Sequence, residues 1–186
     1  MADHVCPVWI GYLLASPLRR LFQDPARILG PFARPGMIAL EVGPAMGFFS
    51  VPLARLVGPA GRVVCVDAQR ELLDGLARRA AKAGVAERID ARLCTDDGFA
   101  LGDLGGAIDF ALAFAVVHEL PRQSPFFEAV FRALKGGARL LVAEPTGHVP
   151  PDAFAETARA ALAAGFTALE PPRVRSSRVL LLEKPA

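Results

Sequence analysis

The chain has 186 residues, 53% of them hydrophobic, and a formal net charge of only +2. This length suits one domain with its own core, so we expect a single domain over residues 1–186. The small net charge provides no strong field towards nucleic acid or a membrane surface, and we expect neither as a partner. The three cysteines are odd in number and widely spaced, which excludes a disulfide framework and a zinc pattern, so no metal site is expected.

The start of the chain lacks the basic residues of a secretion signal. The longest apolar run, from Phe110 to Val117, is too short to cross a bilayer. We therefore expect a cytoplasmic protein with no membrane segment. Residues 1–35 have apolar side chains near helical spacing, and prolines divide them into short helices. Asp24 followed by Pro25 is typical of a helix start.

The stretch from Met37 to Val57 predicts a buried strand, a turn of small residues and a helix starting at Phe48. This arrangement presents helix N–H groups to a ligand in a parallel sheet. Gly43 is expected to adopt backbone angles closed to other residues, and Gly47 to let the helix pack close to the strand. Glu41 would repel a pyrophosphate, but it suits a ligand with a cationic amino group and one carboxylate. The alternative is a purely structural bend.

Arg62 to Asp67 is apolar on both faces and predicts a central parallel strand. In such a sheet, an acidic side chain at the end of the second strand accepts hydrogen bonds from both ribose hydroxyls of a nucleoside. Asp67 is our candidate for that role. The alternative, a cap for the amphipathic helix from Arg70 to Ala83, is compatible with ribose binding.

Arg88 to Cys94 predicts the third strand, and Ala107 to Phe114 the fourth. The first and fourth strands should be neighbours, at the point where strand order reverses and ligands bind. Phe114 should then line the pocket, with His118 and Glu119 directly beyond it.

The rest of the chain predicts two more helices and three more strands. The helices are expected at Pro125–Lys135 and Asp152–Ala164, and the strands at Ala138–Glu144, Gly165–Leu169 and Ser177–Leu182. Three arginines, Arg173, Arg175 and Arg178, fall around the last turn. We expect a solvated sheet edge protected by charge, with a small nucleic-acid patch as the alternative.

The turn from Glu41 to Gly47 resembles the first motif of class I S-adenosylmethionine-dependent methyltransferases, acidic-x-Gly-x-Gly-x-Gly, with Ala45 at the central glycine. The resemblance extends from Met37 to Glu183, and its small-molecule subtype is ubiquinone/menaquinone-methyltransferase-like. It implies a Rossmann-like α/β fold in residues 36–186: a seven-stranded, mostly parallel sheet with an antiparallel last strand and helices on both faces. It also implies that residues 1–35 form a helical lid.

The resemblance implies S-adenosylmethionine as the cofactor. The residues expected to bind it are Glu41, Gly43, Pro44, Ala45, Gly47, Phe48, Asp67, Ala68, Thr95, Asp96 and Phe114. The contact to adenine stays open between Thr95, Asp96 and Asp97.

A sulfonium is already an activated leaving group, so the main task of the protein is to align the acceptor. Where the acceptor is a phenol, thiol or carbon acid, a base is useful. His118 is the candidate, because imidazole changes charge near neutral pH. Glu119 would orient His118 or bind substrate. The alternative is a histidine that only positions its loop, and Glu144 and His148 are weaker candidates.

We therefore expect a methyltransferase that acts on a small-molecule acceptor, as a monomer or homodimer. No Asn/Asp-Pro-Pro-aromatic motif stands after the fourth strand, which argues against amino- or amide-nitrogen methylation of DNA, RNA or glutamine. One alternative is an S-adenosylmethionine-binding module without catalysis, which Ala45 favours. The other is an NAD-dependent oxidoreductase, which Asp67 suits but Glu41 and the missing Gly-x-Gly-x-x-Gly spacing oppose.

Overall fold

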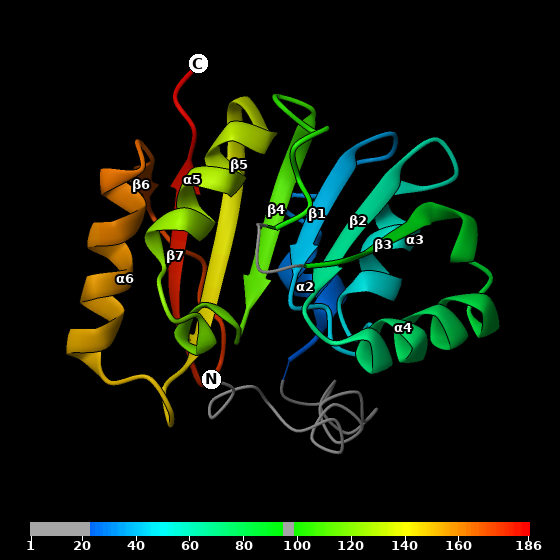
Figure 1. Cartoon of the computed structure of the whole chain (residues 1–186), viewed down its shortest axis with the longest axis horizontal. Coiled ribbons are helices and arrows are strands. Elements are labelled where there is room, and N and C mark those ends of the chain that lie inside the picture. The colour runs from blue at the N-terminus through cyan, green and yellow to red at the C-terminus, as the bar shows by residue number, and fades with distance from the viewer. Residues whose placement is uncertain (1–22, 95–98) are drawn as a thin grey trace.

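The computed structural model describes residues 23–94 and 99–186, which form one mixed sheet with helices packed on it (Figure 1). The strands are β1 (Ile38–Val42), β2 (Arg62–Asp67), β3 (Ile89–Leu93), β4 (Ile108–Phe114), β5 (Leu134–Pro145), β6 (Thr167–Leu169) and β7 (Ser177–Glu183). Their order across the seven-stranded sheet is β3-β2-β1-β4-β5-β7-β6. Only β7 runs antiparallel to its neighbours among these strands. The predicted Rossmann-like sheet is confirmed, including the β1–β4 pair at its centre.

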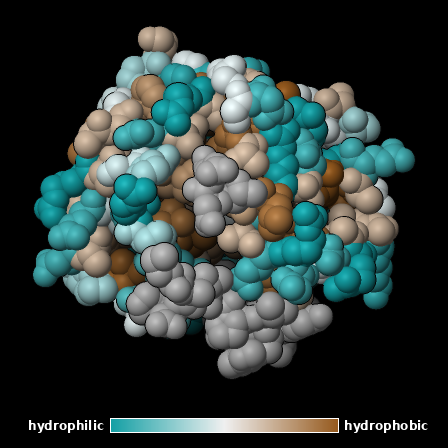
Figure 2. Space-filling view, in the orientation of Figure 1, coloured by the Kyte–Doolittle hydropathy of each residue, from teal (hydrophilic) through white to brown (hydrophobic). Residues whose placement is uncertain are grey.

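The helices follow the apolar periodicity of the sequence. They are α2 (Pro25–Leu29), α3 (Ser50–Val57), α4 (Arg70–Lys82), α5 (Ser124–Ala133) and α6 (Pro151–Ala163), with short 3-10 turns η2 (Ala86–Arg88) and η3 (Val117–Glu119). Asp24 caps α2 as predicted, because its carboxylate accepts the N–H of Ala26 at 3.0 Å. The outer side of α4 is mostly hydrophilic (Figure 2), as expected for an amphipathic surface helix.

Two apolar clusters lie on opposite faces of the sheet. One joins α2, α3 and α4 to the side chains of Ala39 and Leu112, and the other joins α5 and α6 to Leu40 and Ala111. Successive residues of a strand point to opposite faces, so the central strands are apolar along their whole length. No helix in the described ranges has the length and apolar character needed to cross a membrane.

β5 begins four residues earlier than predicted. The sequence placed the strand from Ala138, after a glycine pair that is typical of a helix end, whereas the strand starts at Leu134. Gly137 has φ of +76° and its N–H donates to the Lys184 carbonyl at 2.7 Å, so the glycine pair continues the sheet. The pairing of β4 with β5 shifts register at one point, which accommodates the irregularity. The predicted start of β5 was wrong because the hydrogen-bond partner of Gly137, Lys184, is distant in sequence.

The turn between β1 and α3 depends on its glycines. Gly43 has φ of +70°, and a Cβ there would lie 2.6 Å from Cγ2 of Val116. Gly47 has φ of +84°, and its Cβ would lie 2.6 Å from Cδ1 of Leu76. The close neighbour of Gly47 is therefore α4, rather than the strand that we expected. The helix itself starts at Ser50, two residues later than predicted.

We predict that Gly43→Ala destabilises the protein more than Gly84→Ala. Both positions have φ near +70°, but a Cβ at Gly84 meets nothing within 4 Å. The Gly84 variant should lose about 1–2 kcal/mol of unfolding free energy from backbone strain alone. The Gly43 variant should lose about 1–3 kcal/mol more from the collision with Val116. Urea unfolding measures both, and equal losses would show that the turn relaxes around the added methyl.

Candidate functional site

Glu41 lies on β1 with only 2% of its surface exposed. The register of the parallel strands pairs it with Cys65 of β2, so both side chains point to the α3 face. Burial raises the pKa of the Cys65 thiol, and the charge of Glu41 raises it further. Glu41 is thus a buried acid at the carboxyl end of β1, close to the glycine turn. Cys65 is a small residue of the core with no exposed surface.

Asp67 lies at the end of β2 and is 9% exposed. Its Oδ1 accepts the N–H of Gln69 at 3.0 Å. Burial raises the pKa of Asp67, while hydrogen bonds from the backbone of Gln69, Ala45 and Ala68 oppose that rise. The carboxylate therefore connects the turn after β1 with the segment after β2. The alternative that Asp67 caps α4 is wrong, because Gln69 is the N-cap residue and Asp67 contacts the N–H of that residue. Ribose binding stays a prediction.

Ala45 occupies the left-handed region of backbone angles, with φ of +47°. This explains why the motif that it resembles has glycine at this place, since a Cβ costs about 1 kcal/mol there. The hydrogen bond from the Ala45 backbone to Asp67 offsets part of that strain. The neighbouring Pro44 carbonyl accepts the N–H of Gly47 at 2.9 Å, which closes the turn.

The two aromatic residues predicted to bind the cofactor lie in the core. Phe48 is 4% exposed and Phe114 is 8% exposed. Phe49 lies between them, with ring centroids 5.0 Å from Phe48 and 4.4 Å from Phe114. These rings support the turn from the α3 face. A contact of either side chain with a ligand stays a prediction.

His118 and Glu144 form a hydrogen-bonded pair at the carboxyl ends of β4 and β5. Glu144 has no exposed surface, and its Oε1 accepts the N–H of Val117 at 2.8 Å. Its Oε2 makes a short hydrogen bond with Nδ1 of His118. The chain turns sharply before this pair, with φ of +56° at Ala115. That turn brings η3 back towards β5, where the Ala115 N–H donates to the Ala143 carbonyl at 2.8 Å.

The environment of His118 favours its charged form. The hydrogen bond to Glu144 raises the pKa of His118 above 6.5, burial opposes the rise, and the charges of Glu144 and Glu119 add to it. Since Nδ1 is held by Glu144, Nε2 is the nitrogen left to meet a substrate. The His148 ring lies 6.4 Å from the His118 ring, centroid to centroid. A carboxylate, an imidazole and a second imidazole thus gather at one edge of the sheet.

The structure gives Glu144 the orienting role that the sequence analysis considered for Glu119. Glu119 acts on His118 through its charge, whereas Glu144 holds the ring directly. The sequence feature that could have indicated this role for Glu144 was its position at the end of the predicted fifth strand. Carboxyl ends of neighbouring parallel strands meet at one edge, so an acid there comes close to residues that follow β4.

Three predicted site residues and the predicted lid fall largely outside the described part of the chain. Thr95, Asp96 and Asp97 lie in the gap at residues 95–98, and residues 1–22 precede the first described residue. Their roles stay predictions. Within the described ranges, no group of three or more metal-ligating side chains comes together.

We predict that Glu144→Gln lowers the pKa of His118. The neutral amide removes both the carboxylate partner and its charge, which are the main causes of the raised value. NMR titration of the His118 ring would measure the change. Glu119→Gln is the matched control, because it removes one charge without touching that hydrogen bond, and its effect should be smaller. A larger drop in the Glu119 variant would contradict the assignment.

Comparisons with known proteins agree with this geometry. A family model described as a methyltransferase domain matches residues 33–170. An arsenite methyltransferase from Halobacterium salinarum is 28% identical over 125 residues, which are 63% of this chain and 30% of that protein. A 37.1 kDa transposon protein from Streptomyces fradiae is 29% identical over 119 residues, 61% of this chain and 31% of that protein. The chain thus spans about a third of the length of these curated relatives.

Solved structures share the whole architecture. A SAM-dependent methyltransferase from Aquifex aeolicus superposes with a TM-score of 0.86 at 22% identity, covering 97% of this chain and 100% of that one. A methyltransferase described as putative, from Methanococcus maripaludis, gives 0.80 at 11% identity, covering 100% and 98%. At sequence identities this low, the structural similarity shows that these proteins share a fold. Because the family model covers most of the chain, the protein belongs to the methyltransferase-domain family and has the class I fold of S-adenosylmethionine-dependent methyltransferases.

Proposed function

We propose that the protein transfers a methyl group from S-adenosylmethionine to a small-molecule acceptor, with His118 as the base. The observation that carries this proposal is the hydrogen-bonded pair of His118 and buried Glu144. It stands at the carboxyl edge of a sheet whose family transfers methyl groups. Ligands of open α/β sheets bind at that edge.

The residues around the β1 turn fit the proposed cofactor. The missing side chains at Gly43 and Gly47 let Val116 and α4 approach closely, so the turn keeps a compact backbone that a ligand can contact. The buried acid Glu41 favours a cationic ligand over a diphosphate at this place. We propose that Asp67, at the end of β2, accepts hydrogen bonds from the ribose hydroxyls. The rest of the predicted set consists of Pro44, Ala45, Phe48, Ala68, Thr95, Asp96 and Phe114.

The cofactor supplies an activated methyl group, and the residues of the chain handle the acceptor proton. His118 Nε2 accepts a proton from the hydroxyl, thiol or carbon acid of the acceptor while Glu144 holds the opposite ring nitrogen. The raised pKa of His118 means that its neutral, basic form prevails only above the ordinary histidine value. Activity should therefore rise with pH through a value above 6.5. Glu144 is the positioning residue, and Glu119 strengthens the base through its charge.

We also propose that the protein is cytoplasmic and that it is a monomer or a homodimer. Among the described residues, Cys65 and Cys94 form no disulfide bond. Two acceptors should be tested. One is a quinol, which the quinone-methyltransferase resemblance suggests, and the other is arsenite, which the name of the Halobacterium relative suggests. A binding module without chemistry is the second candidate, and the strained Ala45 in the turn favours it.

We predict that S-adenosylhomocysteine binds to the protein and that Asp67→Asn weakens this binding about tenfold, because the amide loses a charge-assisted hydrogen bond. Isothermal titration calorimetry measures the affinity. Asp74→Asn on the exposed side of α4 is the matched control and should bind as the native protein does. Tight NAD binding without S-adenosylhomocysteine binding would end the methyltransferase proposal in favour of an oxidoreductase.

We predict that His118→Ala lowers turnover by about 10²–10⁴-fold and leaves the affinity for S-adenosylhomocysteine unchanged within twofold. Transfer of radiolabelled methyl to phenols, thiols, carbon acids, quinols and arsenite would identify an acceptor and measure turnover. His148→Ala should have a much smaller effect, since its ring does not share the hydrogen bond to Glu144. Lost cofactor affinity in the His118 variant would reassign the residue to binding. Cofactor binding without transfer to any acceptor would favour the binding module.

A further inference from the structure

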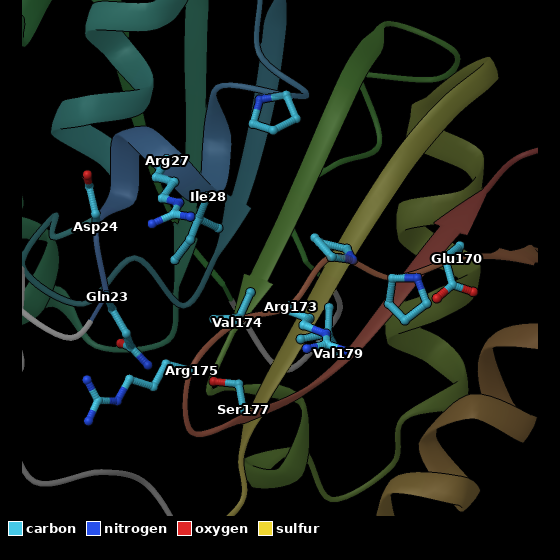
Figure 3. Close-up of a pocket in the computed structure, with 13 residues that line it drawn as sticks. Gln23, Asp24, Arg27, Ile28, Glu170, Arg173, Val174, Arg175, Ser177 and Val179 are labelled. Carbon is cyan, nitrogen blue, oxygen red and sulfur yellow. The ribbon is translucent and has the colours of Figure 1, made fainter.

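A groove of about 990 Å³ lies between α2 and the chain that joins β6 to β7. Figure 3 shows Arg27 of α2 on one side of it and Arg173 and Ser177 on the other, while the Arg175 side chain extends towards Gln23. These two walls come from opposite ends of the sequence. The volume is in the range of small-molecule pockets.

Three arginines line this groove. Arg27, Arg173 and Arg175 are all exposed, and each is a lining residue. Within residues 23–94 and 99–186, neither Arg27 nor Arg173 forms an ion pair. Guanidinium groups bind carboxylates and phosphates through paired hydrogen bonds. The sequence expectation of a solvated, charged edge omitted Arg27, which only the fold brings to the other two.

The carboxylates at the groove do not cancel this charge. Three arginines line the groove against two carboxylates, Asp24 and Glu170, so its lining keeps a net positive charge. Glu170 lies at the far end of the groove, away from Asp24 and Arg27 (Figure 3). An anion entering between Arg27 and Arg173 would therefore meet positive charge.

The floor of the groove is apolar. Ile28, Val174 and Val179 line it and also pack against the core cluster of the α3 face. Val174 is only 8% exposed. An apolar floor beneath a cationic rim suits a molecule with an apolar body and one anionic group, rather than a fully hydrated ion.

The groove adjoins the sheet edge that holds His118 and Glu144. Ser177, at the start of β7, pairs with Pro145, the residue directly after Glu144. The Thr146 N–H donates to the Ser176 carbonyl at 3.1 Å, which joins the two loops beyond the strands. The two sites face opposite sides of the sheet, because the groove residue Val179 pairs with Ala143 on the α3 face whereas Glu144 points to the α5 face with Val117. A ligand anchored in the groove therefore reaches His118 only by extending past the carboxyl end of β5.

We propose that this groove binds the carboxylate or phosphate of a small, partly apolar molecule, and that this molecule is the methyl acceptor. The second half of the proposal rests on the proposed function. Arg27 and Arg173 grip the anionic group, and Ile28, Val174 and Val179 contact the apolar body. The substrate class that follows is a hydroxylated or otherwise protonated acceptor that carries an acidic substituent.

Phenyl phosphate, benzoate and neutral phenol are the probes, titrated into isotope-labelled protein and followed by amide chemical shifts. We expect at least one of the two anions to shift groove residues and to bind at least fivefold more tightly than phenol. The double variant Arg27→Gln, Arg173→Gln should weaken that anion at least fivefold. The matched control Arg78→Gln, Arg159→Gln removes two exposed arginines outside the groove and should leave binding unchanged. The relative affinity of the two anions distinguishes a carboxylate ligand from a phosphate.

Equal binding of phenol, or unchanged binding in the double variant, would overturn the anion site. If a single-stranded oligonucleotide bound more tightly than both anions, and did so through the same two arginines, the ligand of the groove would be nucleic acid and the small-molecule proposal would be wrong. For the acceptor role, phenyl phosphate or benzoate should inhibit methyl transfer competitively with an acceptor found by radiolabel transfer, and non-competitive inhibition would overturn that role. Calorimetry with S-adenosylhomocysteine tests the proposed function separately from the groove. Failure to bind S-adenosylhomocysteine would end the methyltransferase proposal, whereas the anion titration would still show whether the groove binds an anion.

Discussion

The carboxylate of Glu144 connects two strands and one catalytic candidate at the carboxyl edge of the sheet. It has no exposed surface, so burying its charge requires hydrogen-bond donors in place of water. The Val117 N–H and the His118 ring supply them. Those donors come from η3, and η3 reaches β5 only because the chain turns sharply at Ala115. The orientation of the histidine is therefore a consequence of how β4 and β5 pair, and His118 and Glu144 form one hydrogen-bonded unit.

The β1 turn shows a similar dependence between loops that follow adjacent strands. Asp67, at the end of β2, accepts hydrogen bonds from both the Ala45 turn and the Gln69 segment. Gly43 lies against Val116, which belongs to the loop after β4. Three loops thus support one another across the centre of the sheet. Such mutual support allows Ala45 to hold a strained backbone angle that would be costly in a free loop.

The two halves of the proposed chemistry share the end of β5. The histidine pair lies on the α5 face and the arginine groove on the α3 face, and the two approach each other at the end of β5, where Pro145 pairs with Ser177. A base with a raised pKa suits acceptors whose proton is weakly acidic, and a cationic groove suits acceptors with a fixed negative group. One molecule can carry both features, which is why the groove is assigned to the acceptor.

The sequence alone determined the sheet, because apolar strands, glycine turns and amphipathic helices follow local periodicity along the chain. It also indicated His118, Asp67 and the turn after Glu41 as candidate site residues, because they lie at or just beyond the ends of predicted strands. Only the tertiary structure decided that Glu144 holds His118 and that Arg27 joins Arg173, since both pairs link residues far apart in the chain. The early start of β5 had the same cause, because its glycine pair follows the hydrogen bonds of a distant strand. Local patterns specify which element forms, and packing between elements decides which side chains meet.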